Sequence, residues 1–169
     1  MTEPSYQLLD IWYNDLYMIG HAHYEAATHY SRRNMQLGVP VAILSAAVGT
    51  TVFASVGSNP ATWAKIIVGV VSFTAAVLAS LHTHLKYQER AEKHRIAGAR
   101  FIALLKEVEI NLNIPLEDEN ELRLWCIDLK RKWDKLSEDS PTVPPKIFAR
   151  HRSKHKYSKL GGQGNQKDG

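Results

Sequence analysis

The chain carries eight histidines, so a metal site is the first chemistry to consider. Two pairs of histidines are two residues apart, at 21/23 and 82/84. On a helix, residues at this spacing point about 200° apart, so neither pair can chelate one ion. His21, Glu25 and His29 share a helix face at four-residue spacing, a pattern that could bind a divalent metal between neighbouring subunits. An ordinary solvated face is the favoured interpretation, and we expect no metal site.

Other catalytic signatures are missing from the sequence. It has no Gly-rich phosphate loop and no nucleophile elbow. The single cysteine, Cys126, cannot form an intramolecular disulfide and lies in a helical pattern where a small buried apolar side chain is the default. Acidic and basic residues alternate between 86 and 112, which is typical of a solvated or intersubunit face. We therefore expect a non-enzymatic protein without a cofactor.

A different kind of chemistry is indicated by small and polar residues that fall on one face of the apolar segment 62–85. They are Gly69, Ser72, Ala76, Ser80 and Thr83. Two interpretations remain open for this polar stripe: tight helix packing in an oligomer, or the lining of a wet passage through a membrane. An earlier segment has a ridge of small residues, which would let another helix backbone approach closely. This ridge contains Gly38, Ala42 and Ala46, with Gly49 beside them.

The two segments that carry these residues are long enough to cross a bilayer. No charged residue occurs between Arg33 and Lys65, and the sequence predicts transmembrane helices over 37–56 and 62–85. A helix of 20 residues rises about 30 Å, the thickness of a bilayer core. The Gly, Ser, Asn and Pro at 57–60 favour a turn, so the helices should run antiparallel. The alternative is a pair of core helices in a soluble protein; the length of both runs favours the membrane.

Loop charges predict the orientation of this hairpin. Basic residues precede the first span and follow the second, whereas the connecting region offers only Lys65. Because positive charge concentrates on the cytoplasmic side, both termini should be cytoplasmic. The chain is then a multi-pass membrane protein whose immediate partner is the lipid bilayer.

Helices are predicted on both sides of the hairpin, which makes the chain all-α. Over 5–34, apolar residues alternate three and four apart, as in a helix that packs along another; an interfacial helix is the competing interpretation. The same spacing over 86–112 predicts that the second span continues into the cytoplasm without a break. A further helix over 116–137 has its own apolar stripe and should fold back on the preceding one.

Residues 139–169 are predicted to form a disordered basic tail. Prolines occur at 141, 144 and 145, the run ARHRSKHKYSK follows, and no periodic apolar face is present. Attraction to anionic lipid is one functional interpretation and nucleic-acid contact competes with it. A solubilising tail without a specific role is the third, and we expect no nucleic-acid partner.

Two stretches of the sequence resemble a known family. They are GVPVAILSAAVGTTVFASV in the first span and YQERAEKHRIAGARFIALLKEVE after the second. Together they resemble the SLATT family, the SMODS- and SLOG-associating two-transmembrane effector domains of bacteria, and the resemblance covers roughly residues 8 to 137 of a domain spanning 1–138. The matching positions are Gly38, Pro40 and Gly49 in the first span and the segment 90–94.

The resemblance implies a small effector in the bacterial inner membrane that belongs to an antiviral defence or conflict system. Such an effector is expected to form a homo-oligomer that perforates or depolarises the membrane, killing or arresting the cell. The sequence shows no fused sensor domain, so two triggers remain open: a separate nucleotide synthetase or nucleotide sensor gates the effector, or the chain binds a nucleotide itself. No catalytic residue is transferred from the family. The alternative is a non-conducting membrane anchor that recruits a cytoplasmic partner.

Overall fold

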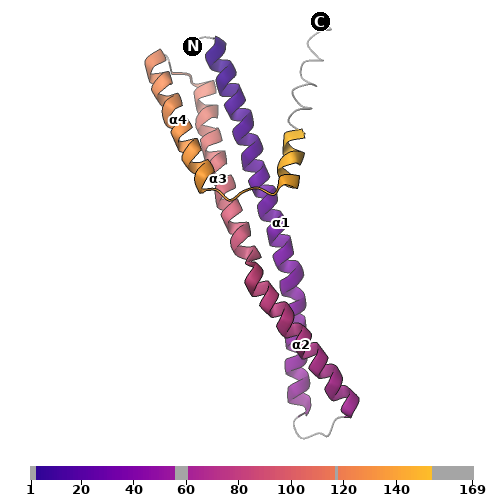
Figure 1. Cartoon of the computed structure of the whole chain (residues 1–169). Coiled ribbons are helices and arrows are strands. Elements are labelled where there is room, and N and C mark those ends of the chain that lie inside the picture. The colour runs from indigo at the N-terminus through magenta and orange to yellow at the C-terminus, as the bar shows by residue number, and fades with distance from the viewer. Residues whose placement is uncertain (1–2, 56–60, 117, 154–169) are drawn as a thin grey trace. The chain divides into compact units, whose positions relative to one another are not determined.

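The computed structural model describes residues 3–55, 61–116 and 118–153, and its regular elements are helices (Figure 1). The long elements are α1 (Glu3–Ser55), α2 (Thr62–Leu85), α3 (Tyr87–Asn113) and α4 (Glu119–Asp139). Residues 145–153 are helical as well, and no strand occurs in the described ranges. This confirms the all-α class.

The chain divides into two compact units, which we describe separately. The bundle unit contains the residues up to Thr28 together with those from Ala91 onward. The apolar unit is His29–Arg90. The helix α1 contributes to both, because its first half belongs to the bundle unit and its second half to the apolar unit.

The bundle unit is held together by an apolar core between the first half of α1, α3 and α4, which lie alongside one another (Figure 1). Leu16, Val108 and Leu129 are essentially inaccessible to solvent. The indole rings of Trp12 and Trp133 meet edge to face at 6.1 Å between centroids, which links α1 to α4. The first helix is therefore a packed seam, as favoured from the sequence, and α4 folds back on α3 as predicted.

Local sequence explains where α4 begins. Asp118 is its N-cap, and the side-chain carboxylate accepts a hydrogen bond of 2.9 Å from the backbone N–H of Asn120. Glu119 and Glu121 occupy the first turn, where negative charge is favourable. An ion pair of 2.9 Å between Lys132 and Glu107 then ties the helix to α3. The predicted start at 116 was thus a few residues early.

Two glycines allow α1 and α3 to approach closely in the bundle unit. A Cβ atom placed on Gly98 would lie 3.1 Å from the backbone oxygen of Gly20 and 3.3 Å from the ring of Tyr24. A backbone atom cannot yield as a flexible side chain can, so only glycine fits at position 98 without shifting a helix.

Replacing Gly98 by valine is expected to destabilise the bundle unit by about 2 kcal/mol, because the added atoms overpack this contact. Thermal unfolding of the detergent-solubilised chain, followed by circular dichroism, measures the effect. Gly69→Ala is the control, since nothing lies within 4 Å of a Cβ at that position. An equal unfolding temperature for Gly98→Val and the wild type would show that the close approach is absent.

Three sequence expectations need correction. The first is the unbroken helix from the second span into the cytoplasm, which is wrong because Lys86 separates α2 from α3. Its φ is 48°, in the left-handed region. This conformation costs a non-glycine residue about 1 kcal/mol or more, and apolar periodicity carries no signal for it.

The second correction concerns the division between the first cytoplasmic helix and the first span. We expected separate helices over 5–34 and 37–56, whereas α1 runs from Glu3 to Ser55 without interruption. Pro40 lies inside it. A proline removes one backbone donor and crowds the preceding turn, but the remaining hydrogen bonds suffice to continue the helix here.

The third correction concerns the start of the tail. Disorder was predicted from 139, yet α4 continues to Asp139 and residues 145–153 are helical. Ile147 is 7% exposed and packs with Val143 against Ala22 and Ala26 of α1. These two side chains lack helical periodicity with their neighbours, so the pattern gave no sign of burial. The remainder of the predicted tail, 154–169, and the predicted turn at 57–60 lie outside the described residues.

Candidate functional site

The apolar unit exposes large apolar side chains on both of its long helices. In the second half of α1 they are Met35, Val39 and Ile43; in α2 they are Trp63, Ile66, Ile67, Val70, Phe73, Val77 and Leu81. Phe73 is 74% exposed and Trp63 is 67% exposed. Surfaces of this extent are not left in water by soluble monomers, which rarely expose contiguous apolar patches beyond a few hundred Å².

One described stretch, Thr62–Asn113, contains an 18-residue window that is long and apolar enough to cross a membrane. Only 6% of that window is buried in the structure. The core helix of a soluble protein would be mostly buried, so low burial separates this stretch from that alternative. The first expected span, 37–56, ends outside the described residues, and the insertion of both spans stays a prediction.

Polar side chains join α1 to α2 and to the first turn of α3 at one end of the apolar unit. The Nε2 atom of His82 lies 3.1 Å from the Oδ1 atom of Asn34, and the Asn34 amide donates at 3.3 Å to the side-chain oxygen of Gln88. A Cβ on Gly38 would come within 3.2 Å of His82 Nε2. Gly38 therefore allows the imidazole to sit against α1, which is a helix-packing contact within this unit.

The polar stripe of α2 mostly faces outward in the single chain. Ser72 is half-buried, whereas Gly69, Ala76, Ser80 and Thr83 are exposed. Two of its hydroxyls donate to their own helix: Ser72 to the carbonyl of Val68 at 2.7 Å, and Thr83 to that of Ala79 at 3.0 Å. These bonds satisfy the hydroxyls locally and suit either a helix contact or a wet lining.

The small-residue ridge of α1 also faces outward beyond Gly38. Ala42 and Ala46 are exposed, and nothing lies within 4 Å of a Cβ built on Gly49. No neighbour would therefore contact a side chain at position 49 in the single chain. A helix partner for the rest of the ridge stays a prediction.

A pair of buried histidines lies in the bundle unit. His23 of α1 and His94 of α3 are each 3% exposed, and their Nδ1 atoms are 3.0 Å apart. One ring must donate its Nδ1 hydrogen while the other accepts, so at least one of the two is neutral. The ring of Phe101 stacks on His23 with centroids 5.3 Å apart.

The environment of this pair disfavours positive charge. Burial, and then the neighbouring His94, lowers the pKa of His23 from 6.5 to about 4. Burial also lowers the pKa of His94. Both histidines lie on the apolar stripes recognised in the sequence, but their pairing depends on how α1 and α3 are aligned, which the stripes do not specify.

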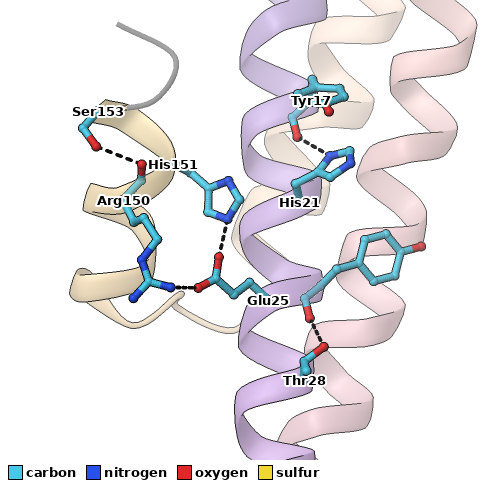
Figure 2. Close-up of polar contacts among 8 residues, drawn as sticks. Tyr17, His21, Glu25, Thr28, Arg150, His151 and Ser153 are labelled. Carbon is cyan, nitrogen blue, oxygen red and sulfur yellow. Dashed lines mark hydrogen bonds and ion pairs between the residues drawn. The ribbon is translucent and has the colours of Figure 1, made fainter. Parts of the chain in front are cut away.

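The metal hypothesis placed His21, Glu25 and His29 on one face of a helix. In the structure, His21 and Glu25 of that face make other contacts. Figure 2 shows Glu25 between Arg150 and His151 of the segment 145–153. Arg150 donates to one carboxylate oxygen, and His151 Nε2 lies 2.7 Å from the other. His21 instead contacts the backbone oxygen of Tyr17 at 2.9 Å. In the part of the chain that the structure describes, no three potential ligands gather around a common point.

Comparison with known proteins supplies the family. The model of the SMODS and SLOG-associating 2TM effector domain family 4 matches residues 8–143, which is most of the chain. No curated protein and no solved structure matches the chain. The matched region begins within α1 and contains α2, α3 and α4, so it includes parts of both units. The chain therefore belongs to the SMODS and SLOG-associating 2TM effector domain family, as the resemblance of its first span and of its α3 segment to the SLATT family indicated.

Proposed function

We propose that the protein is a membrane effector of a bacterial antiviral defence or conflict system. On activation, several copies assemble and depolarise the inner membrane, which kills or arrests the cell. The apolar unit provides the two spans, and both termini remain in the cytoplasm with the bundle unit. Membership in a family of two-transmembrane effector domains supports this proposal.

The observation that carries the proposal is the exposed apolar surface of α2. Ile67 and Val70, which point away from the polar stripe, are each more than half exposed, on a helix of 24 residues. Such a helix extends about 36 Å, enough for the hydrocarbon core of a bilayer. Lipid tails would cover these side chains, which are apolar and need no hydrogen-bond partner.

Conduction would require an oligomer, because two helices cannot enclose a passage. The single chain presents two surfaces for assembly: the ridge at Ala42 and Ala46, and the polar stripe at Ser80 and Thr83. Small residues at helix contacts allow close approach in lipid, where no hydrophobic force drives association. In the proposed assembly the ridge packs against a neighbouring copy and the stripe faces the passage.

The trigger would come from outside the chain. The family name links these domains to SMODS and SLOG modules, so we propose that a nucleotide synthetase or sensor of this kind activates the effector. The chain itself is proposed to act without catalysis, and the cytoplasmic bundle unit would receive the signal.

Membrane potential, read by a voltage-sensitive dye in bacteria that express the full chain with its partner genes, tests the proposal. The wild type is expected to depolarise the membrane, and the double variant Ser72→Leu with Ser80→Leu is expected to lose this activity, because it makes the stripe apolar. Val70→Leu with Val77→Leu is the matched control on the lipid-facing side. It should insert equally and remain active.

The competing function is a non-conducting anchor that holds a cytoplasmic partner at the membrane. It is favoured by the packed core of the bundle unit, which requires no membrane around it. Intact potential after activation of the complete system would support the anchor. If the variant with Ser72→Leu and Ser80→Leu depolarises the membrane as the wild type does, the polar stripe does not line the passage.

A further inference from the structure

A basic groove lies on the bundle unit between α3 and the C-terminal end of α4. Its main pocket has a volume of about 390 Å³ and continues into a second of about 320 Å³. Arg100, Leu136 and Asp139 line both parts, so the two form one groove. Ile96 and Leu136 provide apolar surface along it.

The charged groups along the groove are mostly cationic. Lys93 and Arg100 come from α3, and Lys132 and Lys135 come from α4. Asp139 is the carboxylate that faces them among the described lining residues. Cations from two helices that converge on one concavity create a positive potential, which attracts anions more strongly than the same charges would on a flat surface.

Arg100 and Lys135 differ from the other cations in their pairing. Lys132 already contacts Glu107 at 2.9 Å and Asp128 at 3.2 Å. Arg100 and Lys135 make no ion pair with any described residue, although both line the second part of the groove. A guanidinium can bind a phosphate through two parallel hydrogen bonds, and an ammonium adds a point charge beside it.

We propose that this groove binds a phosphate-bearing organic molecule, with the phosphate on Arg100 and Lys135 and the apolar part on Ile96 and Leu136. The volume suits a small ligand rather than a macromolecule, since ligand pockets typically measure about 300–1,000 Å³. Asp139 repels a bare anion and can accept a hydrogen bond from a hydroxyl or amino group, which favours an organic phosphate over an inorganic one. The same chemistry occurs in a soluble phosphate ester and in a lipid headgroup.

Binding of two probes to the full chain in phosphatidylcholine nanodiscs tests the proposal and separates these sources. One probe is ATP, and the other is short-chain, water-soluble phosphatidylglycerol. Saturable binding of either probe is expected, weakened at least about tenfold by Arg100→Gln with Lys135→Gln, because two charge-assisted contacts are lost. Binding of ATP identifies a soluble source, and binding of phosphatidylglycerol alone identifies a headgroup.

The matched control is Lys106→Gln with Arg123→Gln. It removes the same charge from exposed positions of α3 and α4 that do not line the groove. Equal unfolding temperatures show that both double variants are folded. The proposal is overturned if neither probe binds saturably, or if the control weakens binding as much as the groove variant. Neither outcome bears on depolarisation, so this site and the proposed function fail independently.

Discussion

Lowering the pH from 7 to 4 is expected to destabilise the bundle unit by up to about 3 kcal/mol through the His23–His94 pair. The unfolded chain, with an ordinary histidine pKa near 6.5, takes up protons as the pH falls below that value. The folded state takes up a proton at His23 only at lower pH, because burial and His94 hold the pKa of His23 at about 4. Protonation therefore favours the unfolded state, so the stability that is complete above pH 6.5 is lost progressively down to pH 4.

Thermal unfolding of the solubilised chain between pH 7 and 4 measures this dependence. In His23→Gln with His94→Gln, overall stability should fall, but its slope against pH in this window should become shallower. His29→Gln, at an exposed position, is the control and should keep the wild-type slope. The lowered pKa values of the Asp128 and Glu92 carboxyls also make stability fall toward pH 4, but this contribution is shared by the wild type and the variants. An unchanged slope in the double variant would contradict the role of the pair.

Placing two arginines on the outer face of α2 is expected to remove the protein from the membrane fraction. Ile67 and Val70 are 53% and 60% exposed, and in the proposed topology both face lipid. An arginine near the centre of a membrane helix costs about 2.5–3.5 kcal/mol during insertion. Ile67→Arg with Val70→Arg should therefore shift the chain from the membrane pellet to aggregates or degradation products.

A closely matched control exists in the bundle unit. Leu124 and Ile127 of α4 are also exposed apolar residues, at 67% and 58%. If only the apolar unit lies in the bilayer, Leu124→Arg with Ile127→Arg should leave membrane recovery unchanged. Fractionation followed by immunoblotting compares the two variants. Equal losses would show that the arginines act through general misfolding, and equal retention would place α2 outside the bilayer.

Much of the bundle unit could be predicted from the sequence, because helix packing requires a periodic spacing of apolar residues. An apolar stripe was predicted for the helix over 116–137, and Leu122, Leu129 and Leu136, which form it, are all buried. Burial of a helix face is set by residues three and four apart, so it can be read from one chain.

Features that depend on a single residue or on alignment between helices could not be predicted in the same way. Lys86 adopts a left-handed conformation that glycine normally marks. The contact between His23 and His94 requires a particular register of α1 on α3, and Glu25 meets Arg150 across 125 positions in the sequence. The two side-chain contacts join segments that are far apart in the sequence. Local sequence patterns do not indicate which distant segments meet.

The sequence predicted which residues make up the candidate site, but it did not predict what those residues contact. The polar stripe and the small-residue ridge were identified by spacing, and the structure leaves Ser80 and Ala46 exposed on their helices. Gly38 of the ridge meets another helix through His82, whereas nothing lies within 4 Å of a Cβ built on Gly49. Which copy or lipid covers the others depends on an assembly that a single chain does not contain, so their roles stay predictions.

Labelling of single cysteines in intact cells tests the central claim, that the apolar unit crosses the membrane with both termini inside. Burial raises the pKa of the Cys126 thiol, which makes it a poor reporter, so Cys126→Ser provides the background. Ser58→Cys, in the connection outside the described residues, is predicted to react with a membrane-impermeant maleimide in whole cells. Ser137→Cys, at an exposed position of α4, should react only after lysis. Protection of Ser58→Cys in whole cells, or labelling of Ser137→Cys there, would contradict the account.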